Sequence, residues 1–202
     1  MTTLSPLGVT VLALLAERDM HAYEMYQLML ERSEDKVVKV SPGSLYRAVE
    51  RFAADGLIAE VAVERQGNRP ERTVYAITDE GRERLRATIA EMLGRHVNEY
   101  PEFPVAIGEA HHLPAAEVAE LLGVRLASIR ELLGFIDASL ARIEARGLPT
   151  AYILNVHYTR TLLVAEATWL EQTIGDLESG ELAWPEAAGS SGAKRVSRSS
   201  AH

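Results

Sequence analysis

Residues 40–52 read VSPGSLYRAVERF and predict a short helix with one buried face and one exposed face. Ser41 can cap the first free N–H groups of a helix, and Pro42 suits the first helical position, where a missing N–H costs nothing. The apolar residues recur at helical spacing on one face: Leu45, Val49 and Phe52. The other faces carry hydroxyl and guanidinium groups, which bond phosphate oxygens and the acceptor edge of guanine. The stretch therefore predicts a recognition helix that contacts DNA.

Two further helices are expected before this one. Residues 4–17 begin with Ser5 and Pro6, a cap and first-turn pair, and continue as a largely apolar run. Residues 22–32 place a broad apolar stripe among polar residues, and a short extended link over 36–40 follows. The order of these segments predicts a helix-turn-helix.

The periodicity changes after Gly56, which is a natural left-handed end for the third helix. Two β-prone runs follow, at 57–65 and 72–77, and a turn-rich loop with basic residues joins them. Thr78 then caps a fourth helix. Three helices, a two-stranded hairpin and a further helix make a winged helix-turn-helix, with the hairpin as its wing.

The order and spacing of these motifs resemble the PadR family of transcriptional regulators over about the first 90 residues. The motifs that carry the resemblance are LSPLG at 4–8, HAYEM at 21–25, SPGSLYR at 41–47 with GLI at 56–58, and RP at 69–70 leading to YAITDEG at 75–81. The resemblance implies a mainly α fold in which a helical C-terminal domain follows the winged domain. It also implies a homodimer whose C-terminal helices exchange across the interface.

Apolar residues in the second half of the chain recur at alternating steps of four and three, as in a coiled-coil heptad. This pattern predicts two long helices joined by a tight turn into an antiparallel pair. The residues expected to form the dimer core are Leu122, Leu126, Ile129, Leu133, Ile136, Leu140, Ile143, Leu163, Leu170, Ile174 and Leu177. An intramolecular bundle with no partner is the alternative.

The expected organisation has three parts. Residues 1–98 form the winged helix-turn-helix domain, and residues 104–178 form the helical dimerisation domain, which is also the expected place for an effector. Residues 179–202 are rich in Gly, Ser and Ala and are expected to be a disordered tail.

Basic side chains gather between residues 36 and 72, although the net charge of the chain is −8. The negative charge argues against binding of nucleic acid through charge alone, whereas a local basic patch suffices for sequence-specific binding. The residues expected to contact DNA are Lys39, Ser41, Ser44, Tyr46, Arg47, Arg51, Asn68, Arg69 and Arg72. Arg47 is the first choice for reading a base. The alternative is that Arg47 and Arg51 are solvated side chains paired with Glu50 and Asp55.

The chain has no cysteine, which excludes disulfides, zinc-thiolate sites and thiol catalysis. No basic segment with a following apolar run opens the chain, and charges interrupt its apolar stretches, so we expect a cytoplasmic protein that does not enter a membrane. His111 and His112 are adjacent, which should point them to different faces of a helix, and no companion stands at ligand spacing. We therefore expect no metal and no cofactor.

An enzyme is not expected, because the acids and histidines of the second half do not form a nucleophile, a base and an orienting group. The resemblance does imply a response to a small, often aromatic effector near the dimer interface. Candidate effector residues are Tyr152, His157, Tyr158 and Trp169, and the alternative for each is ordinary helix packing.

These observations predict a DNA-binding transcriptional regulator, a repressor, that binds a pseudo-palindromic operator in double-stranded DNA as a homodimer and is released by a small-molecule effector. The alternative is a protein-interaction module whose winged domain does not bind DNA. The net negative charge favours the alternative, and the retained Lys/Arg cluster argues against it.

Overall fold

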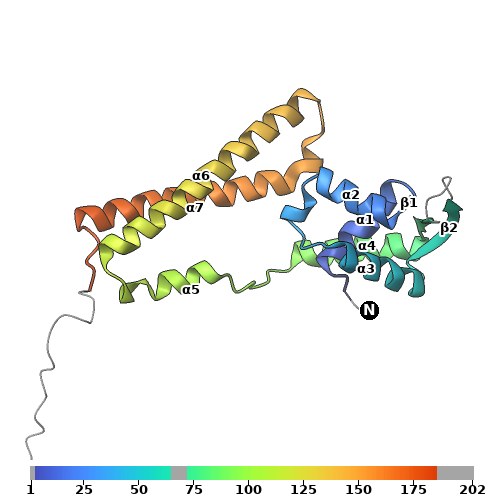
Figure 1. The fold of residues 1–202 in the computed structure, drawn as a ribbon, viewed down its shortest axis with the longest axis horizontal. Coiled ribbons are helices and arrows are strands. Elements are labelled where there is room, and N and C mark those ends of the chain that lie inside the picture. The colour runs from blue at the N-terminus through green and yellow to red at the C-terminus, as the bar shows by residue number, and fades with distance from the viewer. Residues whose placement is uncertain (1–2, 65–71, 186–202) are drawn as a thin grey trace, which may run out of the picture. The chain divides into compact units, whose positions relative to one another are not determined.

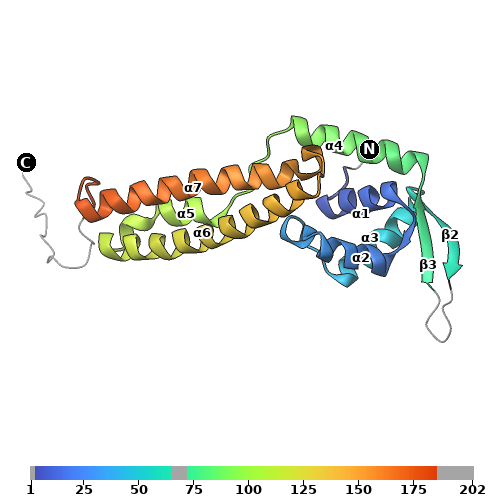
Figure 2. The same ribbon diagram turned by 90° about the horizontal axis from the view of Figure 1, so that it is seen from above.

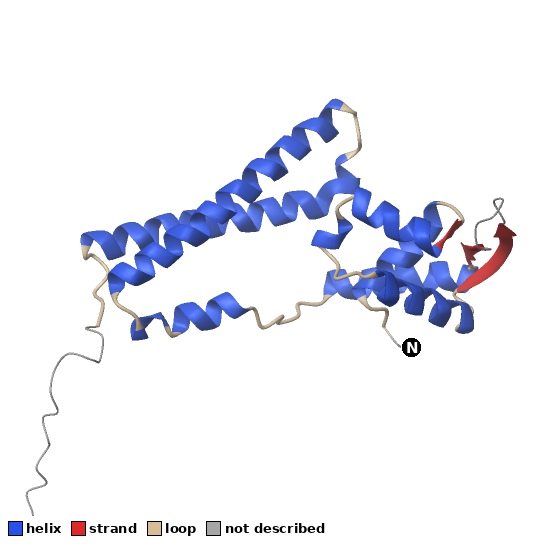
Figure 3. Cartoon of the chain, in the orientation of Figure 1, coloured by secondary structure: helices blue, strands red, loops and turns tan. Residues whose placement is uncertain are grey.

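The computed structural model describes residues 3–64 and 72–185, and the chain divides into two compact units, Met1–Glu99 and Tyr100–His202. Helices make up most of both units, and the strands all belong to one small sheet in the first (Figure 3). The mainly α fold class predicted from the sequence is confirmed. None of the helices in the described ranges is long and apolar enough to cross a bilayer.

The first unit packs four helices beside a small sheet (Figure 1). Its elements are α1 (Pro6–Glu17), β1 (Met20–His21), α2 (Ala22–Glu31), the 3-10 turn η1 (Glu34–Lys36), α3 (Pro42–Ala54), β2 (Ile58–Glu64), β3 (Arg72–Ile77) and α4 (Asp79–Gly94). One apolar core joins α1, α2 and α3, with the side chains of Leu12, Met25 and Phe52 almost completely buried. This core holds α3 by its apolar face.

Side-chain caps begin the helices where the sequence predicts them. The Ser5 hydroxyl accepts the N–H of Gly8 at 3.2 Å, and the Thr78 hydroxyl accepts the N–H of Gly81 at 3.1 Å. At α3, the N–H of Ser44 donates to the Ser41 hydroxyl at 3.2 Å, and the N–H of Ser41 donates to the Ser44 hydroxyl at 2.9 Å. Such a reciprocal cap satisfies two donors that a helix end leaves without partners, so the start of α3 is strongly defined.

The sheet has the strand order β1-β3-β2. Strands β2 and β3 form the predicted hairpin, paired from Ile58 opposite Ile77 to Glu64 opposite Arg72. The expectation of only two strands is wrong, because β1 adds to the outer edge of β3 through two residue pairs. A strand of two residues leaves no alternating pattern in the sequence, so its pairing depends on tertiary contacts. The wing residues 65–71 lie outside the described residues.

The second unit is a helical pair with a shorter helical segment before it. Its elements are α5 (Glu102–Gly108), the 3-10 turn η2 (Ala110–His112), α6 (Ala115–Ala145), the 3-10 turn η3 (Thr150–Ile153) and α7 (Leu154–Ser179). Helices α6 and α7 run antiparallel and pack against each other; they cross at an angle in Figure 1 and lie side by side in Figure 2. The turn between them contains Gly147 with φ 69°, a left-handed conformation that glycine adopts without strain.

Three ion pairs join α6 to α7 and define their register. The guanidinium of Arg125 lies 2.6 Å from the Glu166 carboxylate, and Arg130 lies 2.8 Å from Glu171. Further along, Arg160 lies 2.6 Å from Asp137. Between these pairs, the predicted heptad residues of the two helices meet in one apolar seam, where each is buried or half-buried. The heptad pattern is thus accounted for by packing within one chain.

The predicted C-terminal tail, 179–202, begins where α7 ends. Residues 186–202 lie outside the described residues. Before them, the Trp184 indole N–H donates to the Leu113 carbonyl at 2.9 Å, which ties the chain after α7 to the segment between η2 and α6.

Candidate nucleic-acid interface

Helix α3 is amphipathic, and its polar side chains are the most exposed part of it. Leu45, Val49 and Phe52 are buried in the core of the first unit. Tyr46 is 44% exposed, and Arg47 and Arg51 are exposed as well. Because the buried face packs in the core, the exposed side chains project from a helix backbone that is held in place.

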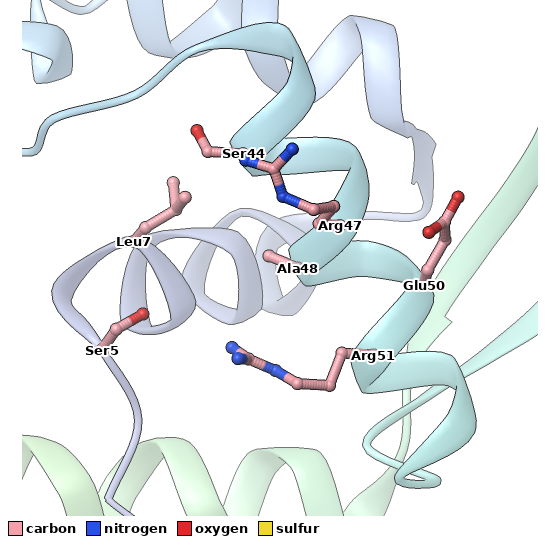
Figure 4. Close-up of a pocket in the computed structure, with 7 residues that line it drawn as sticks. All are labelled: Ser5, Leu7, Ser44, Arg47, Ala48, Glu50 and Arg51. Atoms are coloured by element: carbon pink, nitrogen blue, oxygen red, sulfur yellow. The ribbon is translucent and has the colours of Figure 1, made fainter.

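A surface hollow lies between the N-terminal part of α1 and α3 (Figure 4). Its lining residues are Ser5, Leu7, Ser44, Arg47, Ala48, Glu50 and Arg51. In Figure 4 the guanidinium of Arg51 extends from α3 toward Ser5, whereas the carboxylate of Glu50 points away from it. The hollow therefore combines two guanidinium groups with the start of α1, where the helix dipole favours negative charge.

Neither Arg47 nor Arg51 forms an ion pair within the described residues. The alternative that they pair with Glu50 and Asp55 is therefore not found in the structure. The guanidinium of Arg51 lies 5.3 Å from the centre of the Phe52 ring, a cation–π contact. Both cations remain available to an anion from outside the chain.

The hydroxyls of Ser41 and Ser44 are already engaged, because each accepts a backbone N–H of the other residue. The Ser44 hydroxyl also lies 2.9 Å from the Ser41 carbonyl, to which it donates. These two side chains build the first turn of α3 and present it, while Lys39 lies exposed on the link before it.

Arg72, at the start of β3, lies apart from this hollow. Its guanidinium carbon is 5.4 Å from the centre of the Tyr23 ring, and its Nη1 is 3.4 Å from His21 Nε2. The other two expected wing residues, Asn68 and Arg69, lie outside the described residues. The structure thus brings together Ser44, Arg47 and Arg51, and it places Arg72 at the loop end of the hairpin, beside Tyr23 of α2.

Sequence reasoning missed Ser5 and Leu7 as parts of this surface. The Ser5-Pro6 pair identifies a helix start, but the sequence alone does not show that this start lies against α3. Packing of α1 on α3 creates the hollow, and that contact joins residues about 40 positions apart.

The candidate effector residues of the second unit do not form one cluster within the chain. Tyr152 lies in η3 and is 75% exposed, and His157 and Tyr158 lie near the start of α7. Trp169 is 11 residues after Tyr158, which is roughly 16 Å along a helix that rises 1.5 Å per residue. It packs instead edge-on to Phe103 of α5, at 6.1 Å between ring centres.

Beside the buried seam, each long helix carries a second, exposed apolar stripe. On α6 the stripe is Leu121, Val124, Leu132 and Phe135, and on α7 it is Leu154, Tyr158, Leu162 and Trp169. At 3.6 residues per turn each set falls within an arc of about 80°. On each helix the stripe is rotated from the buried seam in the same sense, by roughly 110° to 135° at 100° per residue. In an antiparallel pair this places both stripes on the same side. We name these eight residues the apolar face.

The two adjacent histidines lie together, contrary to the expectation that they point apart. The rings of His111 and His112 have centroids 4.2 Å apart in the turn η2, and Glu109 Oε2 lies 3.5 Å from His112 Nε2. The segment is a single 3-10 turn whose side chains are exposed, so the rings can turn toward each other. A carboxylate three residues before His112 was overlooked as a companion.

The first unit matches a known family. The sequence profile of the family described as "Transcriptional regulator PadR-like family" matches residues 11–87. No curated protein matches the chain.

Solved structures match over most of both chains. Bacillus subtilis PadR in complex with operator DNA has a TM-score of 0.73 and 19% identity, over 86% of this chain and 99% of that one. Bacillus subtilis PadR in complex with p-coumaric acid has a TM-score of 0.70 and 18% identity, over 85% and 98%. The Vibrio cholerae virulence activator AphA has a TM-score of 0.66 and 20% identity, over 86% and 99%.

At these identities the structural likeness shows a shared fold, and the profile match adds the sequence of the winged domain. Together they show that the chain carries a PadR-like domain in its first unit and has the fold of the PadR transcriptional regulators.

Proposed function

We propose that this protein is a DNA-binding transcriptional regulator that binds a pseudo-palindromic operator as a homodimer. The observation that carries the proposal is a pair of exposed guanidinium groups on α3, those of Arg47 and Arg51. They have no ion-pair partner among the described residues, and they line the same hollow as Ser5 and Leu7 at the start of α1. A protein of the same fold, Bacillus subtilis PadR, has been solved with operator DNA, which supports DNA binding by a chain of this fold.

Each exposed side chain of α3 would contact a different part of the DNA. Arg47 would donate two hydrogen bonds to a guanine edge in the major groove, since a guanidinium fork matches that acceptor pair. Arg51 would bind a backbone phosphate beside the N-terminal turn of α1, where the helix dipole adds to its charge. Tyr46 would contact the backbone or a thymine methyl, and the reciprocal cap of Ser41 and Ser44 would hold the turn that approaches the DNA.

The remaining proposed contacts surround α3. Lys39 would bind phosphate from the link before the helix, and Arg72 would do so from the loop end of the hairpin. Asn68 and Arg69 are the further phosphate contacts proposed for the wing. These contacts position the domain without reading the sequence, because phosphates are the same at every step.

A second copy of the chain would supply the specificity that one domain lacks. Useful discrimination in a genome requires about 4 to 10 kcal/mol over non-specific sites, and two recognition helices on half-sites one helical turn apart, ~34 Å, provide it. The apolar face of α6 and α7 is the surface proposed for dimerisation, because its aromatic and aliphatic side chains lie exposed in a single chain. This assignment moves the proposed interface from the heptad seam, which α6 and α7 already fill within one chain, to the apolar face.

A small aromatic effector would release the operator by binding near that interface. Tyr152, His157, Tyr158 and Trp169 remain the proposed contacts, and the separation of Trp169 along α7 means that a site using all four needs residues from both copies. The complex of Bacillus subtilis PadR with p-coumaric acid supports an effector of this class. Titration of p-coumaric acid into the operator complex tests it, and unchanged operator affinity would count against this compound.

The regulatory outcome that we propose is repression. A promoter carrying the selected operator, fused to a reporter, should fall in output when the protein is expressed. A rise in output would show an activator, the role named for the AphA structure.

Selection of DNA from a random pool by the full-length chain tests the central proposal. We expect enrichment of a two-fold symmetric sequence, and Arg47→Ala should lower gel-shift affinity for it by at least tenfold. Lys36→Ala is the matched control, because Lys36 is an exposed cation of the same unit that lies beside Asp35, at 3.5 Å, and outside the hollow. If no sequence is enriched, the protein-interaction module becomes the better description.

A further inference from the structure

Glu109, His111 and His112 form a cluster of metal-ligating side chains that the proposed function does not use. All three are exposed, and they lie in the turn that connects α5 to α6. One ligand atom from each residue lies within 4.8 Å of the others. Among the described residues, this is the cluster of histidine and carboxylate groups that meets the spacing of a metal site.

The distances are close to those of a tetrahedral site. Zinc binds imidazole nitrogen at 2.0–2.1 Å and carboxylate oxygen at 2.0–2.2 Å, so two ligand atoms of a tetrahedral ion lie about 3.4 Å apart. Glu109 Oε2 and His112 Nε2 are already 3.5 Å apart. The remaining ligand atom has to move inward by about 1.4 Å at most, which a rotation of the exposed His111 side chain supplies.

We propose that Glu109, His111 and His112 bind one Zn²⁺ ion, with water as the fourth ligand. Two imidazoles and one carboxylate suit zinc and exclude the hard cations Mg²⁺ and Ca²⁺, which prefer oxygen ligands alone. The negative carboxylate also balances part of the charge of the ion. Without metal, the same three side chains contact one another: the Glu109 carboxylate lies beside the His112 ring, and the His111 ring lies beside the His112 ring.

The role of the ion would be to fasten the turn between α5 and α6. Glu109 is the residue after α5, and His112 ends η2 just before α6 begins. The neighbouring carbonyl of Leu113 accepts the indole N–H of Trp184, so the same turn also holds the chain that follows α7. A ligand that binds only the folded arrangement stabilises it by mass action.

Isothermal titration calorimetry of the untagged, full-length chain with ZnCl₂ tests the site. We expect one Zn²⁺ per chain, no uptake of Mg²⁺, and a rise in the unfolding temperature with added Zn²⁺. The variants His111→Ala and His112→Ala should each weaken Zn²⁺ binding at least tenfold and lose the rise in unfolding temperature. Glu109→Gln, which keeps the shape of the side chain but removes its charge, should weaken binding less.

His96→Ala is the matched control, because His96 is also an exposed histidine and lies outside the cluster. It should leave Zn²⁺ binding unchanged. Circular dichroism of each variant without metal should match the parent chain, since all three side chains are exposed. Absence of Zn²⁺ binding by the parent, or equal binding by His112→Ala and His96→Ala, would overturn the proposal without bearing on DNA binding.

Discussion

His21 Nε2 lies 3.4 Å from Arg72 Nη1, while His21 Nδ1 accepts the backbone N–H of Glu24 at 3.0 Å. A neutral imidazole that accepts at Nδ1 carries its proton on Nε2. The ring and the guanidinium therefore meet donor to donor, and Arg72 keeps its hydrogen-bond donors for another acceptor. One histidine thus caps α2 and lies beside the Arg72 guanidinium, at the loop end of the hairpin, without accepting a hydrogen bond from it.

His21→Ala should lower the free energy of unfolding by about 1 kcal/mol, because it removes the side-chain cap of α2. His21→Asn is the matched control, since asparagine is among the best N-cap residues and should retain most of the stability. Urea unfolding of the three proteins measures the difference. Equal losses for both variants would show that the cap contributes little.

Gly81→Ala should lower the free energy of unfolding far more than the addition of one methyl group usually does. A Cβ at this position would lie 2.1 Å from the Leu57 carbonyl oxygen, where α4 begins against the base of the hairpin. We expect a loss of about 3 kcal/mol or more, because the obstruction is backbone and cannot rotate away. Gly123→Ala in α6 meets nothing within 4 Å and should instead stabilise by up to about 1 kcal/mol. Thermal unfolding of both variants would reveal the contrast.

Burial of the Glu34 carboxyl should make the free energy of unfolding fall as pH rises. Its Oε2 is buried and has no hydrogen-bond partner among the described residues, and burial raises the pKa of Glu34 while Arg32 opposes the rise. The folded pKa exceeds the unfolded one, so folding favours the protonated form. Stability from this group is present below the unfolded pKa and is lost as pH rises through the folded pKa.

Glu34→Gln should therefore raise the free energy of unfolding at neutral pH and have little effect at pH 4. Urea unfolding at a series of pH values checks this. Glu17 provides the opposite case, because its hydrogen bonds to Arg32 lower the pKa of Glu17. Glu17→Gln should cost stability at neutral pH and not in acid, where the native carboxylate is protonated. If both variants shift stability in the same direction, the assignment of Glu34 is wrong.

Several features were predictable from the sequence because they are local. A helix start depends on a few adjacent residues, so Ser5, Ser41 and Thr78 identify three of them directly. The edge strand β1 was missed because its pairing with β3 joins residues about 50 positions apart. The same reason hides the hollow between Ser5 and Arg51.

The heptad pattern shows which side of each long helix is buried but not what buries it. A seam within one chain and a seam between two chains need the same apolar spacing. The spacing of Leu126 and Ile136 therefore predicts a buried helix interface but not whether the partner helix belongs to the same chain or to a second one. Only the fold assigns them to the α6–α7 pair and leaves Phe135 and Leu162 exposed.

Phe135→Glu and Ile136→Ala should separate assembly from folding, although the two positions are adjacent. Phe135 is 60% exposed on the apolar face, and Ile136 is 9% exposed in the seam. A charge at 135 should dissociate the proposed dimer while helicity persists. Ile136→Ala should cost roughly 2 to 5 kcal/mol of unfolding free energy and leave the assembly state of the folded protein unchanged. Light scattering after size exclusion, with circular dichroism, measures both; a dimer that survives Phe135→Glu would place the interface elsewhere.

Arg51→Ala should reduce the salt dependence of operator binding, whereas Arg47→Ala should relax the base preference. Each phosphate contact adds about −0.9 to the slope of log affinity against log salt, so loss of Arg51 from both copies should reduce the slope by roughly 1.8. Fluorescence anisotropy with a labelled operator, between 50 and 200 mM salt, measures it. The titrations should be repeated with operators altered at single positions. Arg51→Ala should lower the affinity for all of these operators by a similar factor, whereas Arg47→Ala should lose discrimination between bases at one position only.

The reciprocal cap of Ser41 and Ser44 separates the residues that begin α3 from those that face outward along it. Tyr46, Arg47, Glu50 and Arg51 carry no part of that cap, so the helix keeps its start whatever occupies those positions. The positions are thus open to exchange, in evolution or in a library, at little risk to folding. Under the proposed function, a chain of this design can acquire a new operator by changing a few outward side chains while retaining its scaffold.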